Sequence, residues 1–276
     1  MSELIIKSIG GILNTSSLIS PRFASIQALN LFTSPRKGRY TSEQIPFIES
    51  AFFEELEFDG DTVATYRWPG KNKTILLAHG WESNSERWSY LIPLLREQDY
   101  NIVALDAPAH GRSGSKRFNA ILYSEFMAQV VKKHQPEIII GHSVGGMATV
   151  FGMHNHNFKS LKKMILLGAP AHFVGVFGRY KKMMGFNERI SSGLDQLVLE
   201  NFGKTTDYFS ASDFVSTFEL RSLIIHDKKD KIIPFSDGES YAKNFKNSEF
   251  IATEGFGHSL KDASLAPKII AFINQD

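Results

Sequence analysis

The stretch Glu137-Ile138-Ile139-Ile140-Gly141-His142-Ser143-Val144-Gly145-Gly146-Met147 decides the fold of this chain. An apolar run leads into Gly-x-Ser-x-Gly and a helix-compatible segment follows, which predicts a strand, a sharp turn and a helix. Gly141 and Gly145 are small because a side chain at either position would collide with the neighbouring strand and helix. This context favours a reactive Ser143 over a glycine-rich turn without chemistry.

The predicted turn presents Ser143 at the carboxyl end of a parallel strand, beside the amide of Val144 and the positive end of the following helix. A negatively charged oxygen, formed when Ser143 attacks a carbonyl, would be stabilised there. A serine hydroxyl is a poor nucleophile on its own, so it requires a base and an acid that orients the base. Two later loops supply these residue types in the order Asp230, then His258.

The composition excludes several classes of protein. The chain has 276 residues, 42% hydrophobic and 22% charged, with a net charge of +2 and no cysteine. This size fits one large α/β domain or two small ones. The interspersed charges predict no nucleic-acid partner. The absence of cysteine excludes disulfides, thiolate metal sites and a cysteine nucleophile, and we expect neither a metal nor a cofactor.

No segment predicts export or membrane insertion. Met1–Leu13 is interrupted by Glu3 and Lys7 and lacks a basic leader and a cleavage site, so we interpret it as an amphipathic helix. No later run approaches the roughly 18 apolar residues of a transmembrane helix. These features favour the cytoplasm, and the oligomeric state is not predicted.

Strands and helices alternate along most of the chain. Asp59-Gly60-Asp61 separates two β-rich runs, which predicts a hairpin. The later alternation predicts a parallel sheet that is covered on both faces. The predicted strands are 53–58, 62–68, 73–78, 101–105, the run before Ser143, 163–167, 222–226 and 249–252, and the predicted helices are 85–98, 119–134, one from Val144, 236–245 and one after His258.

Two regions do not follow this alternation. Residues 171–219 are apolar without a convincing strand, which predicts a helical cap insertion. Residues 1–40 form an N-terminal helical extension, in which Ser20-Pro21 starts a helix and Ser34-Pro35 ends it. The predicted core therefore comprises residues 41–170 and 220–276.

From about residue 52 to the end, the motifs resemble the α/β-hydrolase fold. They are His79-Gly80-Trp81, Asp106–Gly114, the Gly-x-Ser-x-Gly turn, and the loops of Asp230 and His258. The resemblance implies a mostly parallel sheet of about eight strands with helices on both faces and a helical cap. The combination of His-Gly-Trp-Glu with Asp-Ala-Pro-Ala-His-Gly-Arg-Ser is similar to an uncharacterised bacterial branch of hydrolases.

The resemblance also implies roles for single residues. Ser143 matches the family's nucleophile, Asp230 its acid and His258 its general base. The amides of Trp81 and Val144 match the two donors of its oxyanion hole.

Asp227 offers a second carboxylate near the acid. We prefer Asp230, because the family places its acid four residues before a proline, here Pro234. His142, His79 and His110 are expected to be structural, with His142 hydrogen-bonded to the backbone under the turn.

These residues predict a serine hydrolase that cleaves carboxylic esters of small or medium apolar substrates through an acyl-serine intermediate. The alternatives are an acyltransferase, thioesterase or lactonase of the same fold, and a ligand-binding regulatory protein on a hydrolase fold. Most apolar side chains of the insertion are expected in its own core, and the others are expected to line the substrate pocket. The candidates for substrate binding are Phe173, Phe177, Met183 and Met184.

Overall fold

The computed structural model describes residues 3–275 and divides into two compact units. One unit, here called the helical unit, combines the residues up to Ser34 with His172–Ser210. The other, here called the sheet unit, combines Pro35–Ala171 with the residues from Ala211 onward. The predicted N-terminal extension and the predicted insertion thus form one unit, with boundaries near residues 34, 171 and 210 instead of 40, 170 and 219.

The sheet unit contains an eight-stranded sheet with the order β1-β2-β4-β3-β5-β6-β7-β8. The predicted hairpin pair β1–β2 and the pair β2–β4 are antiparallel, and all other pairs are parallel, which confirms the predicted mostly parallel sheet. Asp59 (φ 50°) and Gly60 (φ 79°) form the turn of the predicted β1–β2 hairpin. The strands are β1 Phe52–Phe58, β2 Asp61–Trp68, β3 Asn72–Ala78, β4 Tyr100–Leu105, β5 Ile138–His142, β6 Lys163–Leu167, β7 Arg221–Asp227 and β8 Ser248–Thr253.

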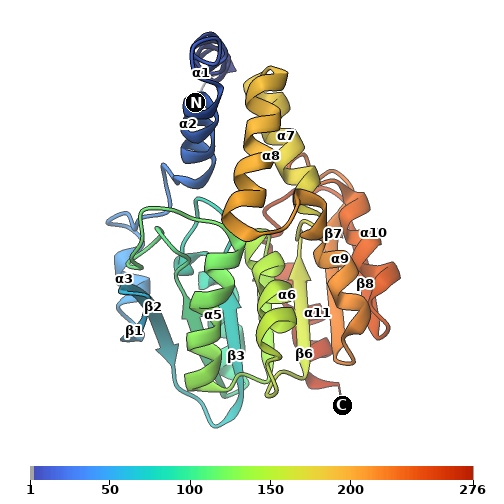
Figure 1. Ribbon diagram of the computed structural model, residues 1–276. Helices are drawn as coiled ribbons and strands as arrows, with labels where there is room; N and C mark the ends of the chain where they lie inside the picture. The colour runs from blue at the N-terminus through green and yellow to red at the C-terminus, as the bar shows by residue number, and fades with distance from the viewer. Residues whose placement is uncertain (1–2, 276) are drawn as a thin grey trace. The chain divides into compact units, whose positions relative to one another are not determined.

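Helices cover both faces of this sheet. Figure 1 shows α5 and α6 in front of the strands and α11 behind them. The helices of the sheet unit are α3 Ile45–Ile48, α4 Ile92–Glu97, α5 Ala120–His134, α6 Val144–His156, α9 Ala211–Phe214, α10 Phe235–Asn244 and α11 Ala266–Asn274, and the 3₁₀ helices are η1 Ser85–Tyr90, η3 Val215–Thr217 and η4 Ala263–Leu265.

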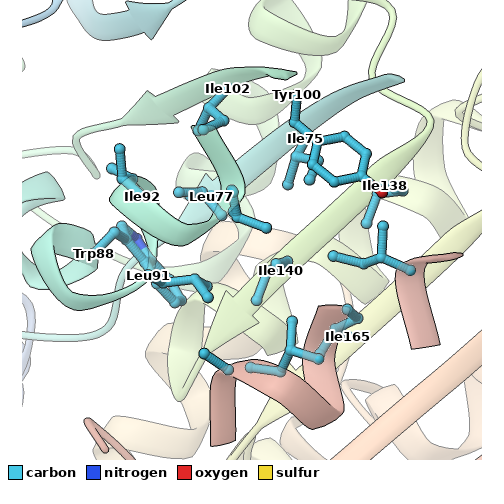
Figure 2. Close-up of a cluster of buried hydrophobic side chains, with 14 of the residues drawn as sticks. Ile75, Leu77, Trp88, Leu91, Ile92, Tyr100, Ile102, Ile138, Ile140 and Ile165 are labelled. Atoms are coloured by element: carbon cyan, nitrogen blue, oxygen red, sulfur yellow. The ribbon is translucent and has the colours of Figure 1, made fainter. Parts of the chain in front are cut away.

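A large cluster of buried apolar side chains lies on the α4 and α11 side of the sheet. Figure 2 shows how Ile75 and Leu77 of β3 and Ile138 and Ile140 of β5 gather with Trp88 of η1. All five side chains are almost completely buried. Burying them stabilises the strands whose carboxyl ends carry the predicted site residues, at about 25 cal/mol for each Å² of apolar surface removed from water.

The helical unit packs two segments that are far apart in the sequence. Ser20 caps its second helix by accepting from the amide of Phe23, as its Ser-Pro start predicted. The second helix and the inserted helix 188–202 come into close contact at small residues, because a Cβ on Gly193 would lie 2.1 Å from the Oγ of Ser25. The sequence analysis did not predict this close approach of Ser25 and Gly193. The elements are α1 Glu3–Ser16, α2 Pro21–Thr33, α7 Phe173–Met184, α8 Glu188–Phe202 and η2 Thr206–Tyr208.

One predicted helix is wrong in detail. The predicted helix 85–98 is the 3₁₀ helix η1 followed by the short helix α4, with Leu91 between them. Pro93 lies in the first turn of α4, where its missing N–H costs least, so a new helix starts there. None of the helices between residues 3 and 275 combines the length and the hydropathy that a bilayer span requires.

Candidate active site

Ser143 occupies a strained turn between β5 and α6. Its backbone has φ 52° and ψ −129°, a conformation that costs a non-glycine residue about 1–3 kcal/mol. The amide of Ser143 donates to the carbonyl of Leu167 (2.8 Å), which ties the turn to the next strand. A Cβ on Gly145 would lie 2.4 Å from the carbonyl oxygen of Ala78, so only glycine lets the helix start this close to β3.

His258 contacts both other members of the predicted triad. Its Nε2 lies 3.0 Å from the Oγ of Ser143 and its Nδ1 lies 2.7 Å from Oδ2 of Asp230. A neutral histidine protonated at Nδ1 donates to the carboxylate and accepts from the serine hydroxyl. These distances match the arrangement in which a histidine can remove the proton of a serine.

Asp230 is held by its own loop. Its side chain has no exposed surface, and Oδ1 accepts from the amides of Ile232 (2.8 Å) and Ile233 (2.9 Å). Burial acts to raise the pKa of the carboxyl, but hydrogen bonds from His226, His258 and these amides outweigh burial and hold the pKa well below its usual range. The carboxylate therefore stays negative at neutral pH and faces His258.

Asp227, the other carboxylate of this loop, has different partners. It accepts from Thr253 (2.9 Å) and from the amides of Lys229 and Phe256 (each 2.9 Å), which join β7 to the loop after β8. The structure therefore places Asp230 and not Asp227 against His258.

The loop after β3 runs beside Ser143. A Cβ on Gly80 would lie 3.0 Å from the Cβ of Ser143, so the backbone of the His79-Gly80-Trp81 turn passes the serine closely. Within residues 3–275 the amide of Trp81 has no protein acceptor. The amide of Val144 opens α6, where an N–H has no partner inside its own helix. Both amides predicted for the oxyanion hole therefore belong to the segments that flank Ser143.

Two further histidines surround the site. His142 donates from Nε2 to the carbonyl oxygen of His258 (2.9 Å), the backbone contact predicted for it, and burial holds its pKa well below the ordinary value. His226, which the sequence analysis did not include in the site, has its Nε2 3.5 Å from Oδ2 of Asp230. The signal for His226 was its place at the carboxyl end of β7, directly before the loop of Asp230.

The four residues predicted to bind substrate lie on α7 of the helical unit. Phe177 and Met184 are buried, and Met183 is 52% exposed. The ring of Phe173 stacks on that of Phe177, with centroids 5.0 Å apart, and Phe32 of α2 packs on Phe177 at 5.1 Å. Phe177 thus belongs to the core of the helical unit and the half-buried Phe173 packs on it, and their part in substrate binding stays a prediction.

The arrangement can support nucleophilic attack by a serine assisted by a neutral histidine and a buried carboxylate. Between residues 3 and 275 no group of three or more histidine, aspartate or glutamate side chains is placed to hold a metal ion.

Comparison with known proteins agrees with the fold. Residues 73–180 match the family model described as alpha/beta hydrolase fold. A non-heme haloperoxidase of Rhodococcus erythropolis is 24% identical over 73% of this chain and 91% of its own length. A bifunctional esterase/perhydrolase of Acinetobacter calcoaceticus is 24% identical over 78% of this chain and 97% of its own length.

Solved structures show the same likeness in three dimensions. An esterase from Exiguobacterium antarcticum matches with a TM-score of 0.62 and 17% identity, over 82% of this chain and 100% of that chain. The observed strand order, the turn at Ser143 and the family match over residues 73–180 agree with one another. This protein therefore has the α/β-hydrolase fold.

Proposed function

We propose that the protein is a serine hydrolase that cleaves carboxylic esters of small or medium apolar substrates. The observation that carries the proposal is the continuous contact from Ser143 through His258 to Asp230, at 3.0 and 2.7 Å. The strained turn supports it, because strain of this kind is kept where it serves a reactive group.

In the proposed acylation, Oγ of Ser143 attacks the ester carbonyl while Nε2 of His258 takes the hydroxyl proton. Asp230 holds the ring and stabilises its positive charge. The amides of Trp81 and Val144 donate to the oxygen that becomes negative. When the tetrahedral intermediate collapses, the bond to the alcohol oxygen breaks, His258 returns the proton to that oxygen, and an acyl-Ser143 ester remains.

In the proposed deacylation, water takes the place of the alcohol. His258 removes a proton from the water as its oxygen attacks the acyl carbon, and the same two amides stabilise the second tetrahedral intermediate. Collapse releases the carboxylic acid and returns the proton to Oγ of Ser143. Asp230 remains ionised throughout, in line with its depressed pKa.

A fluorophosphonate probe tests the proposed nucleophile directly. We expect intact-mass spectrometry to find one phosphonyl adduct on the wild-type protein, peptide mapping to place it on Ser143, and Ser143→Ala to remain unlabelled. Hydrolysis of esters graded by acyl length then defines the substrate range. A folded wild-type protein that takes no adduct and cleaves no ester would favour the alternative of a ligand-binding protein on a hydrolase fold.

A second candidate function uses the same acyl-serine with a different acceptor, as an acyltransferase, thioesterase or lactonase does. The likeness to a bifunctional esterase/perhydrolase supports an acceptor test. Product analysis with competing alcohols, amines or hydrogen peroxide measures how the acyl group divides between water and the acceptor. An ester hydrolase delivers most of the acyl group to water at moderate acceptor concentrations, whereas a transferase delivers it to one acceptor preferentially.

A further inference from the structure

A basic pocket lies at the carboxyl edge of the sheet. Its volume is about 970 Å³, and the segment 35–44, the loop after β3, the loop after β4 and Lys261 line it. Six basic and two acidic side chains contribute to its wall, so its net formal charge is +4, compared with +2 for the whole chain. The basic residues are Arg36, Lys37, Arg39, Arg87, Lys116 and Lys261.

Both carboxylates of the pocket are already paired. Glu82 contacts Arg36 (3.2 Å) and Glu86 contacts Lys261 (3.8 Å). Within residues 3–275 the other four basic side chains form no ion pair. The guanidinium of Arg39 donates instead to three backbone carbonyls. The pocket therefore holds positive charge that the chain itself does not neutralise.

Arg87 is an unusual member of this wall. Its side chain is only 8% exposed, its Nε has no hydrogen-bond partner among the described residues, and a terminal nitrogen donates to the carbonyl of Ser259. Burial lowers its pKa to about 10, so it still carries a positive charge at neutral pH. A buried cation without a counter-ion is costly, and an anion in the adjoining pocket would offset that cost.

The pocket and the candidate active site share two segments. Gly80 lies against Ser143, and Glu82, two residues further along, belongs to the pocket wall. Since a chain advances at most about 3.6 Å per residue, the wall begins on the order of 10 Å from Ser143. Ser259, the acceptor of Arg87, directly follows His258.

We propose that this pocket binds an anionic group, a carboxylate or a phosphate, at the end of the substrate opposite the scissile ester. The proposal rests on the proposed function for the ester, and it confines the apolar part of the substrate to the chain between the ester and an anionic distal end. Arginine and lysine nitrogens provide the charge-assisted hydrogen bonds that such oxygens accept. An apolar chain that spans the distance between the pocket and Ser143 would connect the two ends.

Matched esters test the proposal. Pairs of p-nitrophenyl esters with the same acyl length end either in a methyl group or in a carboxylate, and kcat/KM is measured for both. For acyl chains long enough to reach the pocket we expect the wild type to prefer the charged ester by about tenfold at low salt, mainly through KM. The preference should fall as the salt concentration rises. Inorganic phosphate should compete with the charged ester and not with the neutral one.

The double variant Lys37→Ala/Lys116→Ala removes two exposed cations of the pocket and should lower the preference about fivefold. The control Lys159→Ala/Lys162→Ala removes the same charge before β6, at the opposite edge of the sheet, and should leave the preference unchanged. Equal kcat/KM values for both esters at every acyl length, or an equal effect of the control, would overturn the proposal.

Binding separates this proposal from the proposed function. We expect Ser143→Ala, studied by calorimetry, to bind the carboxylate-ended ester about fivefold more tightly than the triple variant that also carries Lys37→Ala/Lys116→Ala. If the wild type neither cleaves esters nor takes the probe, but the fivefold difference in affinity is observed, only the proposed ester chemistry is rejected. Hydrolysis of neutral esters without this difference would reject only the anion pocket.

Discussion

Two buried carboxylates at the same edge of the sheet have different partners. Asp106 follows β4 and Asp230 follows β7, and neither side chain has exposed surface. Asp230 accepts from two amides of its own loop and from His258. Among residues 3–275, the side chain of Asp106 accepts only from groups that keep their protons at neutral pH, namely the hydroxyls of Tyr40, Tyr66 and Ser85 and the amides of Ser85 and Arg112.

The difference separates a structural carboxylate from a candidate catalytic one. Asp106 joins four segments, and together with burial its charge raises the pKa of Tyr40 and Tyr66 far above the ordinary range. Asp230 is fixed on one side by its backbone and presents its other oxygen to a histidine that is 20% exposed and reaches Ser143. Burial alone therefore does not distinguish the two roles, and the identity of the donors does.

The largest expected effect is on activity. Asp230→Asn should keep the fold and lower kcat for ester hydrolysis about 10⁴-fold, because the amide no longer favours the histidine tautomer that accepts from Ser143. The unfolding free energy, measured by urea denaturation, should fall by about 2 kcal/mol or less. Asp227→Asn is the matched control and should retain kcat within about tenfold. If kcat of Asp230→Asn fell less than tenfold, Asp230 would not be the acid that orients His258.

Asp106→Asn should lower stability more than activity, the reverse of Asp230→Asn. The new NH₂ group, placed at Oδ2, replaces the oxygen that accepts from Tyr66 (2.8 Å) and the amide of Arg112 (2.9 Å), so one buried and one half-buried donor lose their acceptor. We expect the unfolding free energy to fall by about 4 kcal/mol, while kcat of the remaining folded protein changes much less than in Asp230→Asn. A stable Asp106→Asn protein that has lost activity would contradict the structural assignment.

His79, next to Asp106, should make stability depend on pH. Burial, reinforced by nearby His110, lowers its pKa to about 4, whereas a histidine in the unfolded chain titrates near 6.5. Between these values the unfolded chain binds a proton that the folded chain does not, so the unfolding free energy falls as the pH falls, by about 3 kcal/mol in total.

Urea denaturation of the wild type and of His79→Gln between pH 7 and pH 4 measures the contribution of His79 to the pH dependence of the unfolding free energy. The glutamine variant lacks the titrating ring, so its unfolding free energy should decrease less over this range. The difference between the two proteins should therefore shrink on acidification. Parallel curves would show that the ring takes up its proton alike in the folded and the unfolded protein, which would contradict the lowered pKa.

The sequence predicted the parts of the structure that depend on local patterns and strand ends. β6, five buried residues, was predicted with its observed bounds, because a short apolar run between turn signals is typical of a strand buried on both faces. Ser143 and His258 are 115 residues apart and His258 and Asp230 are 28 apart. They meet because each follows the carboxyl end of a parallel strand, so the order of motifs was enough to predict the meeting.

Contacts that depend on side-chain packing were not predictable in this way. No local pattern indicates that Tyr40 and Tyr66 share the carboxylate of Asp106, or that Arg87 is buried beside a basic pocket. The pairing of α2 with α8 also depends on close approach at Gly193, and glycine in a helix has many other causes. These features require the three-dimensional structure.

The smallest expected effect tests whether the turn at Ser143 is strained for function. Both Ser143→Gly and Ser143→Ala remove the hydroxyl and its contact to His258, so they differ in how the backbone tolerates φ 52° and ψ −129° and in the greater freedom of glycine in the unfolded chain. Glycine adopts this conformation without a Cβ clash, and we expect Ser143→Gly to be more stable than Ser143→Ala by about 1 kcal/mol in urea denaturation. Equal stability would mean that the backbone conformation at Ser143 imposes no cost on a residue with a Cβ, and the strain could then not be an argument for function.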